Sequence, residues 1–200
     1  AAPAYITSFI AAMAYVWYRW QALPAGLWKH LELVGAGLVI LLALGMTAAL
    51  HDPALFVRLG LQPSADPLAR LKGWQTLATA VETLAVQMPK PPFLLSDRYQ
   101  ISSELAFYVR GQPQAFNVNL GRRMNQYDLW DGLPSLAGHD AIYVQPEKDE
   151  LPQALRATFQ RCDEGKPVII ETLGFELKRF YLFPCWGFSG VPPRPPQVRY

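Results

Sequence analysis

Apolar residues dominate the first fifty positions of the chain, and shorter apolar runs alternate with polar ones after that. The run Leu31–Leu50 holds one charged residue, Glu32, and lacks the polar stripe that a core helix of a soluble protein shows at helical spacing. As a helix, a run of about twenty residues spans about 30 Å, the thickness of the hydrocarbon core of a bilayer. We therefore predict a membrane-spanning helix at this run.

A second apolar run, Ala4–Trp20, predicts another membrane-spanning helix if it extends slightly at both ends. Aromatic residues cluster around the connection between the two runs, where amphipathic rings suit the headgroup layer, although ordinary packing is the alternative. These residues are Tyr15, Trp17, Tyr18, Trp20 and Trp28. The same connection holds Arg19, Lys29 and His30. The positive-inside rule places it in the cytoplasm, so the residues after His51 are expected outside the membrane.

After His51 the apolar runs become short and are separated by polar and turn-forming residues. Asp66 and Pro67 form a helix start signal, and apolar residues then recur at helical spacing until Pro89. Runs of strand length alternate with helical spacing beyond that point. The predicted strands are residues 93–96, 115–118, 141–145, 168–172 and 178–183, and the predicted helices are residues 100–109 and 151–161.

This alternation of strands and helices predicts an α/β fold. We expect a mixed sheet, because the short connection between the last two strands suits an antiparallel pair. The predicted organisation is two transmembrane helices with a short cytoplasmic loop (residues 1–52), a linker (53–66), a small extracytoplasmic α/β domain (67–190) and a Pro-rich tail (191–200).

Charge and composition narrow the possible partners. The formal net charge is only +2, and the basic residues form no long stripe that could follow a nucleic-acid backbone, so we expect no nucleic-acid partner. The chain starts at Ala1 with no basic segment before its first apolar run, unlike a secretory signal, and we expect it to be the C-terminal part of a longer protein. Its two cysteines, Cys162 and Cys185, either form a disulfide or remain unpaired thiols, and their spacing leaves both alternatives open.

The usual motifs of soluble enzymes are absent from the sequence. No Gly-rich nucleotide loop follows a predicted strand, and residues 187–190 read GFSG, one residue too short for a nucleophile elbow. The three histidines, His30, His51 and His139, lack the paired spacing of metal ligands, so no metal site is predicted.

Polar residues are concentrated in one stretch, NVNLGRRMNQYDLWD at residues 117–131. Two adjacent arginines can each fork onto phosphate oxygens, amides and carboxylates can bond sugar hydroxyls, and Tyr127 or Trp130 can stack on a ring. The candidate substrate-binding residues are Arg122, Arg123, Asn125, Gln126, Tyr127 and Asp128. The alternative is a structural loop whose polar groups cap the domain or face membrane headgroups.

A smaller polar group lies where the predicted strand at 93–96 leads into the next helix. It consists of Asp97, Arg98, Tyr99 and Glu104. Open α/β sheets bind ligands at the carboxyl ends of their strands, so this junction is a second candidate site by analogy of fold alone.

Five segments of the chain carry a resemblance to a known family: the opening AAPAY, LKGWQTLA, SDRYQISSELAFYV, the loop NLGRRMNQYDLW and the late YLFPCWGFSG. Together they resemble bacterial glycosyltransferase family 39, whose relatives include protein O-mannosyltransferases and the aminoarabinose transferases that modify lipid A. The resemblance covers nearly the whole chain.

The resemblance implies a multi-pass GT-C enzyme of the bacterial inner membrane with its C-terminal domain in the periplasm. Such an enzyme transfers a sugar from a polyprenyl-phosphate carrier to a lipid, glycan or protein acceptor. Its catalytic acidic residue lies in an upstream extracytoplasmic loop, so we expect no catalytic residue in this chain. No cofactor is expected here beyond the polyprenyl-phosphate sugar donor, and we expect the α/β domain to help select substrate.

Two other classes of function remain open. One is a membrane-anchored extracytoplasmic binding or sensor domain without catalysis, for which the hydrophobic helices serve only as an anchor. The other is a self-sufficient soluble enzyme, which the absence of a nucleophile, base or metal pattern disfavours.

Overall fold

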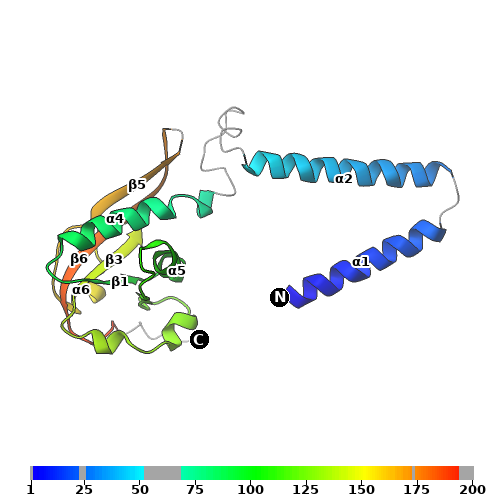
Figure 1. Cartoon of the computed structure of the whole chain (residues 1–200). Coiled ribbons are helices and arrows are strands. Elements are labelled where there is room, and N and C mark those ends of the chain that lie inside the picture. Colours follow the sequence, from blue (N-terminus) through cyan, green and yellow to red (C-terminus); the bar gives the residue numbers. More distant parts are fainter. Residues whose placement is uncertain (1, 23–25, 52–68, 173, 194–200) are drawn as a thin grey trace. The chain divides into compact units, whose positions relative to one another are not determined.

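The computed structural model of the protein describes residues 2–22, 26–51, 69–172 and 174–193 (Figure 1). Contacts divide the chain into two compact units, Ala1–Leu59 and Gly60–Tyr200. The predicted linker at 53–66 and the last seven residues of the predicted tail, 194–200, lie outside the described residues.

The first unit consists of two helices, α1 (Ala2–Ala22) and α2 (Leu27–His51). Both predicted apolar runs are therefore helical. Among the described helices, only α2 is long and apolar enough to cross a membrane by length and composition, over Lys29–Thr47, and none of that stretch is buried. Membrane crossing by α1, which includes Arg19, stays a prediction.

The second unit is built on a mixed sheet of six strands, which confirms the predicted α/β class. The strands are β1 (Phe93–Ser96), β2 (Ala115–Asn117), β3 (Ala141–Pro146), β4 (Phe159–Cys162), β5 (Lys166–Thr172) and β6 (Phe175–Phe188). Their order is β2-β1-β3-β6-β4, and β5 also pairs with β6. β1 is parallel to both β2 and β3, whereas β6 is antiparallel to β3, β4 and β5.

Helices and turns cover both faces of this sheet (Figure 1). The remaining elements are η2 (Ala69–Leu71), α4 (Trp74–Gln87), α5 (Tyr99–Tyr108), η3 (Gln126–Leu129), η4 (Leu133–Leu136) and α6 (Gln153–Arg156). The apolar faces of α4 and α5 pack with Leu94 and Ile142 in one core cluster. Their sequence neighbours Leu95 and Tyr143 point to the opposite face and pack in a second cluster with α6 and η4. Because both faces are covered, β1 is buried at all four positions.

Two predicted helices differ from those observed. The predicted start at Asp66 lies outside the described residues, and α4 begins only after Gly73, whose φ of 85° interrupts the helical conformation. The predicted helix over 151–161 is wrong beyond its first turns, because α6 ends at Arg156 and Phe159–Cys162 form β4 instead. Phe159 and Cys162 are buried against β6, so strand pairing and burial outweigh the local helical spacing.

A disulfide joins Cys162 of β4 to Cys185 of β6, which are direct partners across the two strands. Their Cα atoms lie 4.1 Å apart. Of the two alternatives that the sequence leaves open, the structure therefore shows the paired one. Cys185 also lies opposite Ala141, the first residue of β3, which pairs with Phe93, the first residue of β1. The disulfide thus marks the edge of the sheet where the parallel strands begin.

Candidate functional site

The parallel strands β1 and β3 form a topological switch point. From β1 the chain passes through α5, on the face of the first core cluster, to reach β2. From β2 it returns past β1 to β3 through a segment that includes η4, whose Leu133 packs on the opposite face. Open α/β sheets bind ligands outside the carboxyl ends of strands at such a point. The candidate residues of both predicted groups lie at or near the edge of the sheet that is formed by the carboxyl ends of β1 and β3.

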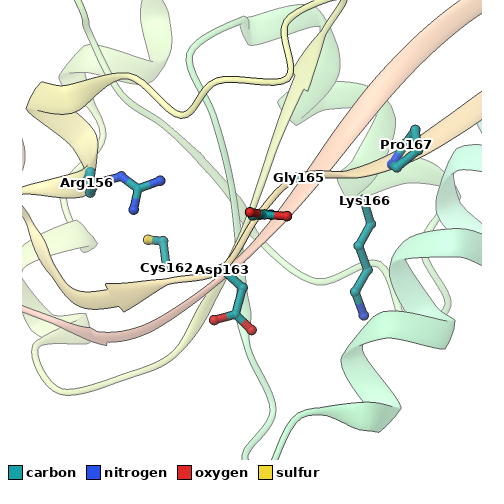
Figure 2. Close-up of a pocket in the computed structure, with 7 residues that line it drawn as sticks. Arg156, Cys162, Asp163, Gly165, Lys166 and Pro167 are labelled. Atoms are coloured by element: carbon teal, nitrogen blue, oxygen red, sulfur yellow. The ribbon is translucent and has the colours of Figure 1, made fainter.

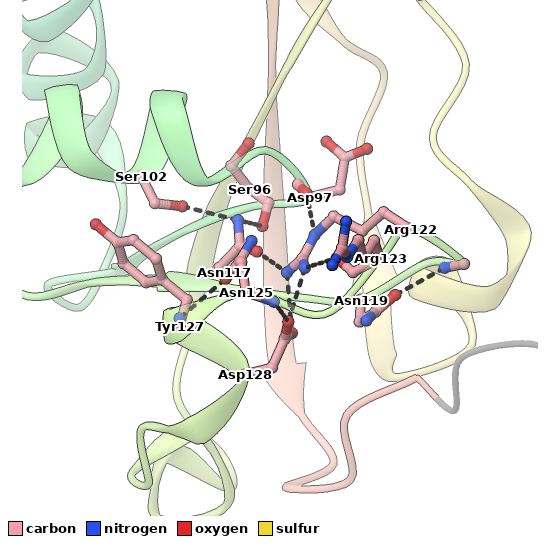
Figure 3. A network of polar contacts seen from close by, with 11 residues as sticks. Ser96, Asp97, Ser102, Asn117, Asn119, Arg122, Arg123, Asn125, Tyr127 and Asp128 are labelled. Carbon is pink, nitrogen blue, oxygen red and sulfur yellow. Dashed lines mark hydrogen bonds and ion pairs between the residues drawn. The ribbon is translucent and has the colours of Figure 1, made fainter. Parts of the chain in front are cut away.

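Arg122 is the centre of a hydrogen-bond network at this edge (Figure 3). Its Nε donates to the backbone oxygen of Asp97 at 2.9 Å, and its Nη1 donates to Oδ2 of Asp128 at 2.7 Å and to the backbone oxygen of Arg123 at 3.0 Å. Its Nη2 donates to Oδ1 of Asp128 at 2.9 Å and to Oδ1 of Asn117. A guanidinium has five N–H donors, and these five contacts use all of them. Arg122 therefore holds the loop to the end of β1, and it could bind a phosphate only by giving up internal partners.

Asp128 and Asn125 complete the frame of the loop. The Asn125 side chain accepts from the backbone N–H of Tyr127 at 2.9 Å, while Oδ2 of Asp128 accepts from the backbone N–H of Asn125 at 2.7 Å. This reciprocal arrangement is a capping box that starts η3. Burial alone raises the pKa of the Asp128 carboxyl, but the hydrogen bonds from Arg122 and Asn125 and the charge of Arg122 outweigh it and lower that pKa.

Asn117 connects the loop to the strands beneath it. Its Nδ2 donates to the backbone oxygen of Ser96 at 3.0 Å and to Oγ of Ser102 at 3.2 Å, and Ser102 Oγ donates to the backbone oxygen of Phe116 at 2.9 Å. Ser96 Oγ in turn donates to the backbone oxygen of Val144 in β3 at 2.7 Å. These three buried polar residues were not among the predicted site residues. Their signal in the sequence is a serine in the otherwise apolar FLLS strand and another on the apolar face of the following helix.

The remaining predicted residues of the loop are accessible to solvent to different degrees. The Tyr127 hydroxyl lies 2.8 Å from Oγ of Ser103 on α5, and its ring contacts that of Trp130 with centroids 4.6 Å apart. Arg123 and Gln126 are exposed, and their side chains form no hydrogen bond or ion pair with any residue that the structure describes. A ligand at this loop would therefore meet Arg123, Gln126 and Trp130 first.

Two buried polar atoms of this region have no partner among the described residues, Oδ1 of Asp97 and Nδ2 of Asn125. Asp97 also influences the buried Tyr143 of β3. Burial is the largest cause that raises the pKa of the Tyr143 phenol, and the nearby charge of Asp97 adds to it. Tyr143 therefore stays protonated and neutral at physiological pH.

An open groove of about 890 Å³ lies on the α5 side of the same edge. Arg98 and Glu104 of the second predicted group line it, together with Glu147 after β3, Trp74 at the start of α4 and Lys178 of β6. The structure thus brings two of the four residues of that group to one hollow at the switch point. Asp97 and Tyr99 do not line it.

Lys178 and Glu104 shape the electrostatics of this groove. Lys178 Nζ lies 4.4 Å from the centre of the Trp74 ring and donates to the backbone oxygens of Arg70 at 2.8 Å and Lys72 at 2.9 Å. Burial lowers the pKa of Lys178, and the carboxylate of Glu104 opposes this. Burial raises the pKa of Glu104, and the charge of Lys178 opposes it. In each group, burial therefore favours the neutral form, and the opposite charge of the neighbouring group favours the charged form.

A second hollow, of about 680 Å³, lies at the connection between β4 and β5 (Figure 2). Cys162, Arg156, Asp163 and Lys166 line it. Because Cys162 belongs to the row of residues at the amino ends of the parallel strands, this hollow lies at the sheet edge opposite to the switch point. Its Asp163 carboxylate already pairs with Arg161 at 3.3 Å. The fold thus favours the α5 groove as the ligand site.

Within the described ranges, no group of three or more His, Cys, Asp or Glu side chains is placed to hold a metal ion. Comparisons of the chain with models of protein families, with curated proteins and with solved structures found no match.

Proposed function

We propose that this chain is the C-terminal part of an integral membrane glycosyltransferase of the bacterial inner membrane. The enzyme transfers a sugar from a polyprenyl-phosphate carrier to a lipid, glycan or protein acceptor. The α/β domain lies in the periplasm and helps to select the substrate. The catalytic acidic residue is supplied from outside this chain.

The observation that supports this proposal best is the convergence of three segments at one edge of the sheet. LKGWQTLA contributes Trp74 to the groove, and SDRYQISSELAFYV contributes Arg98 and Glu104. NLGRRMNQYDLW contributes Arg122, which bonds the backbone of Asp97 at the end of β1. The segments in which the chain resembles family 39 therefore surround the position where an open α/β sheet binds ligands.

Two further features agree with a membrane enzyme that has a domain outside the cytoplasm. The Lys29–Thr47 stretch is apolar and entirely unburied, as expected of a helix whose surroundings are lipid. The disulfide between Cys162 and Cys185 is typical of proteins in an oxidising compartment such as the bacterial periplasm.

The geometry divides the predicted substrate-binding residues into two roles. Arg122, Asn125 and Asp128 hold the loop in place through the hydrogen bonds that join them. Arg123 and Gln126 face solvent and are available to a ligand. Removing Arg123 should therefore affect substrate use without affecting the fold, if the loop itself contacts substrate.

The proposal is tested with the full-length protein that contains this chain. Membranes are supplied with a radiolabelled polyprenyl-phosphate sugar, and transfer is compared between the intact protein and a version that ends at His51. The expected result is that transfer requires the α/β domain, while insertion of the truncated protein into the membrane is unchanged. Absence of transfer by the intact protein, whichever sugar and acceptor are supplied, would contradict the proposal.

The alternative of a membrane-anchored binding domain is favoured by one observation. Met124, Leu129 and Trp130 of the loop are 61%, 66% and 51% exposed, and a protein partner could cover these apolar side chains. A binding domain predicts no sugar transfer by the intact protein, and it predicts a stoichiometric partner on purification that is lost after replacement of Trp130 by Ala.

A further inference from the structure

The groove at the switch point contains polar side chains with no protein partner. Arg98 lies two residues beyond the end of β1, and its guanidinium forms no hydrogen bond or ion pair with a described residue. Gln100, the second residue of α5, is exposed and likewise has no side-chain partner in the described part of the chain. Both line the groove, so a guanidinium and an amide are free to bind a ligand there.

Other groups of the groove are fixed in position. Lys178 is held by two backbone oxygens and by the face of the Trp74 ring. Glu176 and Arg179 bind each other through two hydrogen bonds, at 2.5 and 3.0 Å. These contacts engage Lys178, Glu176 and Arg179 without using Arg98 or Glu104.

Glu147, which follows β3, is held in a conformation that is rare for a residue with a side chain. Its φ is 63°. Its backbone N–H donates to Arg179 O at 3.0 Å, and the buried side chain of Gln145 donates to the backbone oxygens of Lys148 at 2.7 Å and Glu150 at 2.8 Å. Left-handed residues other than glycine and asparagine cluster at functional sites, where the surrounding structure holds them. Here the surrounding hydrogen bonds place the Glu147 backbone in the groove wall.

The balance of charge in the groove selects the type of ligand. Four cationic side chains line it against three carboxylates: Arg70, Arg98, Lys178 and Arg179 against Glu104, Glu147 and Glu176. The three carboxylates repel a polyanion such as a nucleoside triphosphate, and the cations repel a cationic ligand. A ligand with one negative charge and several hydroxyl groups matches the balance, because a guanidinium binds phosphate oxygens and carboxylates accept from hydroxyls.

We propose that this groove binds a sugar phosphodiester. Arg98 binds the phosphodiester oxygens, while Glu104 and Gln100 bind hydroxyls of the sugar. The inference rests on the proposed function, in which the carrier-linked sugar is such a diester. A soluble sugar phosphodiester has the same chemistry, and the test distinguishes the two sources.

The test is isothermal titration calorimetry on the whole chain in lipid nanodiscs, with empty nanodiscs as the blank. The probes are the methyl ester of glucose 1-phosphate, which bears one charge, and glucose and inorganic phosphate alone. We expect the diester to bind at least tenfold more tightly than either fragment. Arg98→Gln should weaken binding of the diester at least tenfold, and Glu104→Gln should weaken binding of both the diester and glucose. The matched control is Arg110→Gln, because Arg110 is an exposed arginine outside both the groove and the loop at residues 117–131, and it should leave the affinity unchanged.

Equal affinity for the diester and inorganic phosphate, or equal weakening by Arg98→Gln and Arg110→Gln, would overturn the assignment. Unchanged near-ultraviolet circular dichroism shows that a variant is folded. A polyprenyl-linked glucose phosphate in the nanodisc bilayer should displace the soluble diester if the carrier is the source, and should leave it bound if the source is soluble. Diester binding without any sugar transfer by the full-length protein contradicts the proposed function alone. Transfer that persists without diester binding contradicts the groove alone.

Discussion

Replacement of Arg122 by Ala is the most informative perturbation of the fold, because one side chain bonds four other residues. The substitution removes all five guanidinium hydrogen bonds and leaves the Asp128 carboxylate, whose side chain is only 9% exposed, without its cation. Breaking a buried ion pair from one side costs about 3–5 kcal/mol. Since the Arg122 side chain is itself 23% exposed, solvent screens part of this, and we expect a loss of about 2–4 kcal/mol of unfolding free energy.

A loss of this size corresponds to a fall of roughly 10 °C in the melting temperature of a domain of this length. The measurement is thermal unfolding of the whole chain in detergent micelles, followed by near-ultraviolet circular dichroism of the α/β domain. Arg123→Ala is the matched control, because its side chain is exposed and unpaired within the described residues, and it should change the unfolding free energy by less than about 0.5 kcal/mol.

A double-mutant cycle isolates the pair itself. Arg122→Ala and Asp128→Asn should be non-additive by more than about 1 kcal/mol, since the two groups share two hydrogen bonds. Equal melting temperatures of the Arg122→Ala and Arg123→Ala proteins would refute the reasoning, because the network would then contribute nothing measurable.

Three further predictions concern the disulfide, the Asp128 carboxyl and Gly73. Reduction or paired Cys→Ser replacement of Cys162 and Cys185, which are 23 residues apart, should cost about 3 kcal/mol of unfolding free energy, and an unchanged melting temperature in dithiothreitol would contradict this. Because the pKa of Asp128 is lowered in the folded protein, its carboxylate contributes to stability above pH 3.8, the ordinary pKa value. This contribution to stability is lost as the pH falls below that value. The stability difference between the wild type and Asp128→Asn should therefore be constant near neutral pH and shrink below 3.8, and a difference independent of pH would be evidence against the interaction. Gly73→Ala should cost about 2–4 kcal/mol in urea unfolding, since the residue has a φ of 85° and an added Cβ would overlap the buried Ile170, and a neutral result would show that this turn is not constrained.

Local patterns were sufficient to predict most of the α/β domain. The apolar run Phe93–Ser96 and the helical spacing after it correspond to β1 and α5 within one residue. Their sequence signals are strong because β1 is buried on both faces and α5 has a continuous apolar side. Such elements are determined by their own residues.

Elements that depend on distant partners could not be predicted in the same way. Phe159–Cys162 has helical spacing with the residues before it, but it pairs with β6 and is tied to it by the disulfide to Cys185. The pairing partner lies more than twenty residues away in the sequence. Local periodicity contains no information on that contact.

The candidate site shows the same limit. The sequence identifies Arg122 as a residue able to bind phosphate, but it does not show that Asp128 and Asn117 already use its donors. The sequence also places Arg98 and Glu104 near a strand end, whereas the groove they share forms only because Lys178 and Trp74 arrive from other elements. Which polar residues are free and which are engaged is a property of the fold.

The most direct test of the central claim is the kinetics of sugar transfer by the full-length protein with Arg98→Gln, compared with Arg110→Gln. If the edge of the sheet at β1 and β3 binds the sugar donor, Arg98→Gln should lower kcat/KM at least tenfold through a higher KM for the polyprenyl-phosphate sugar. Arg110→Gln should change the donor KM by less than about twofold, because Arg110 is exposed and lies outside the groove. Equal kinetic constants for the Arg98→Gln variant and the wild type would contradict a role of this edge in substrate binding.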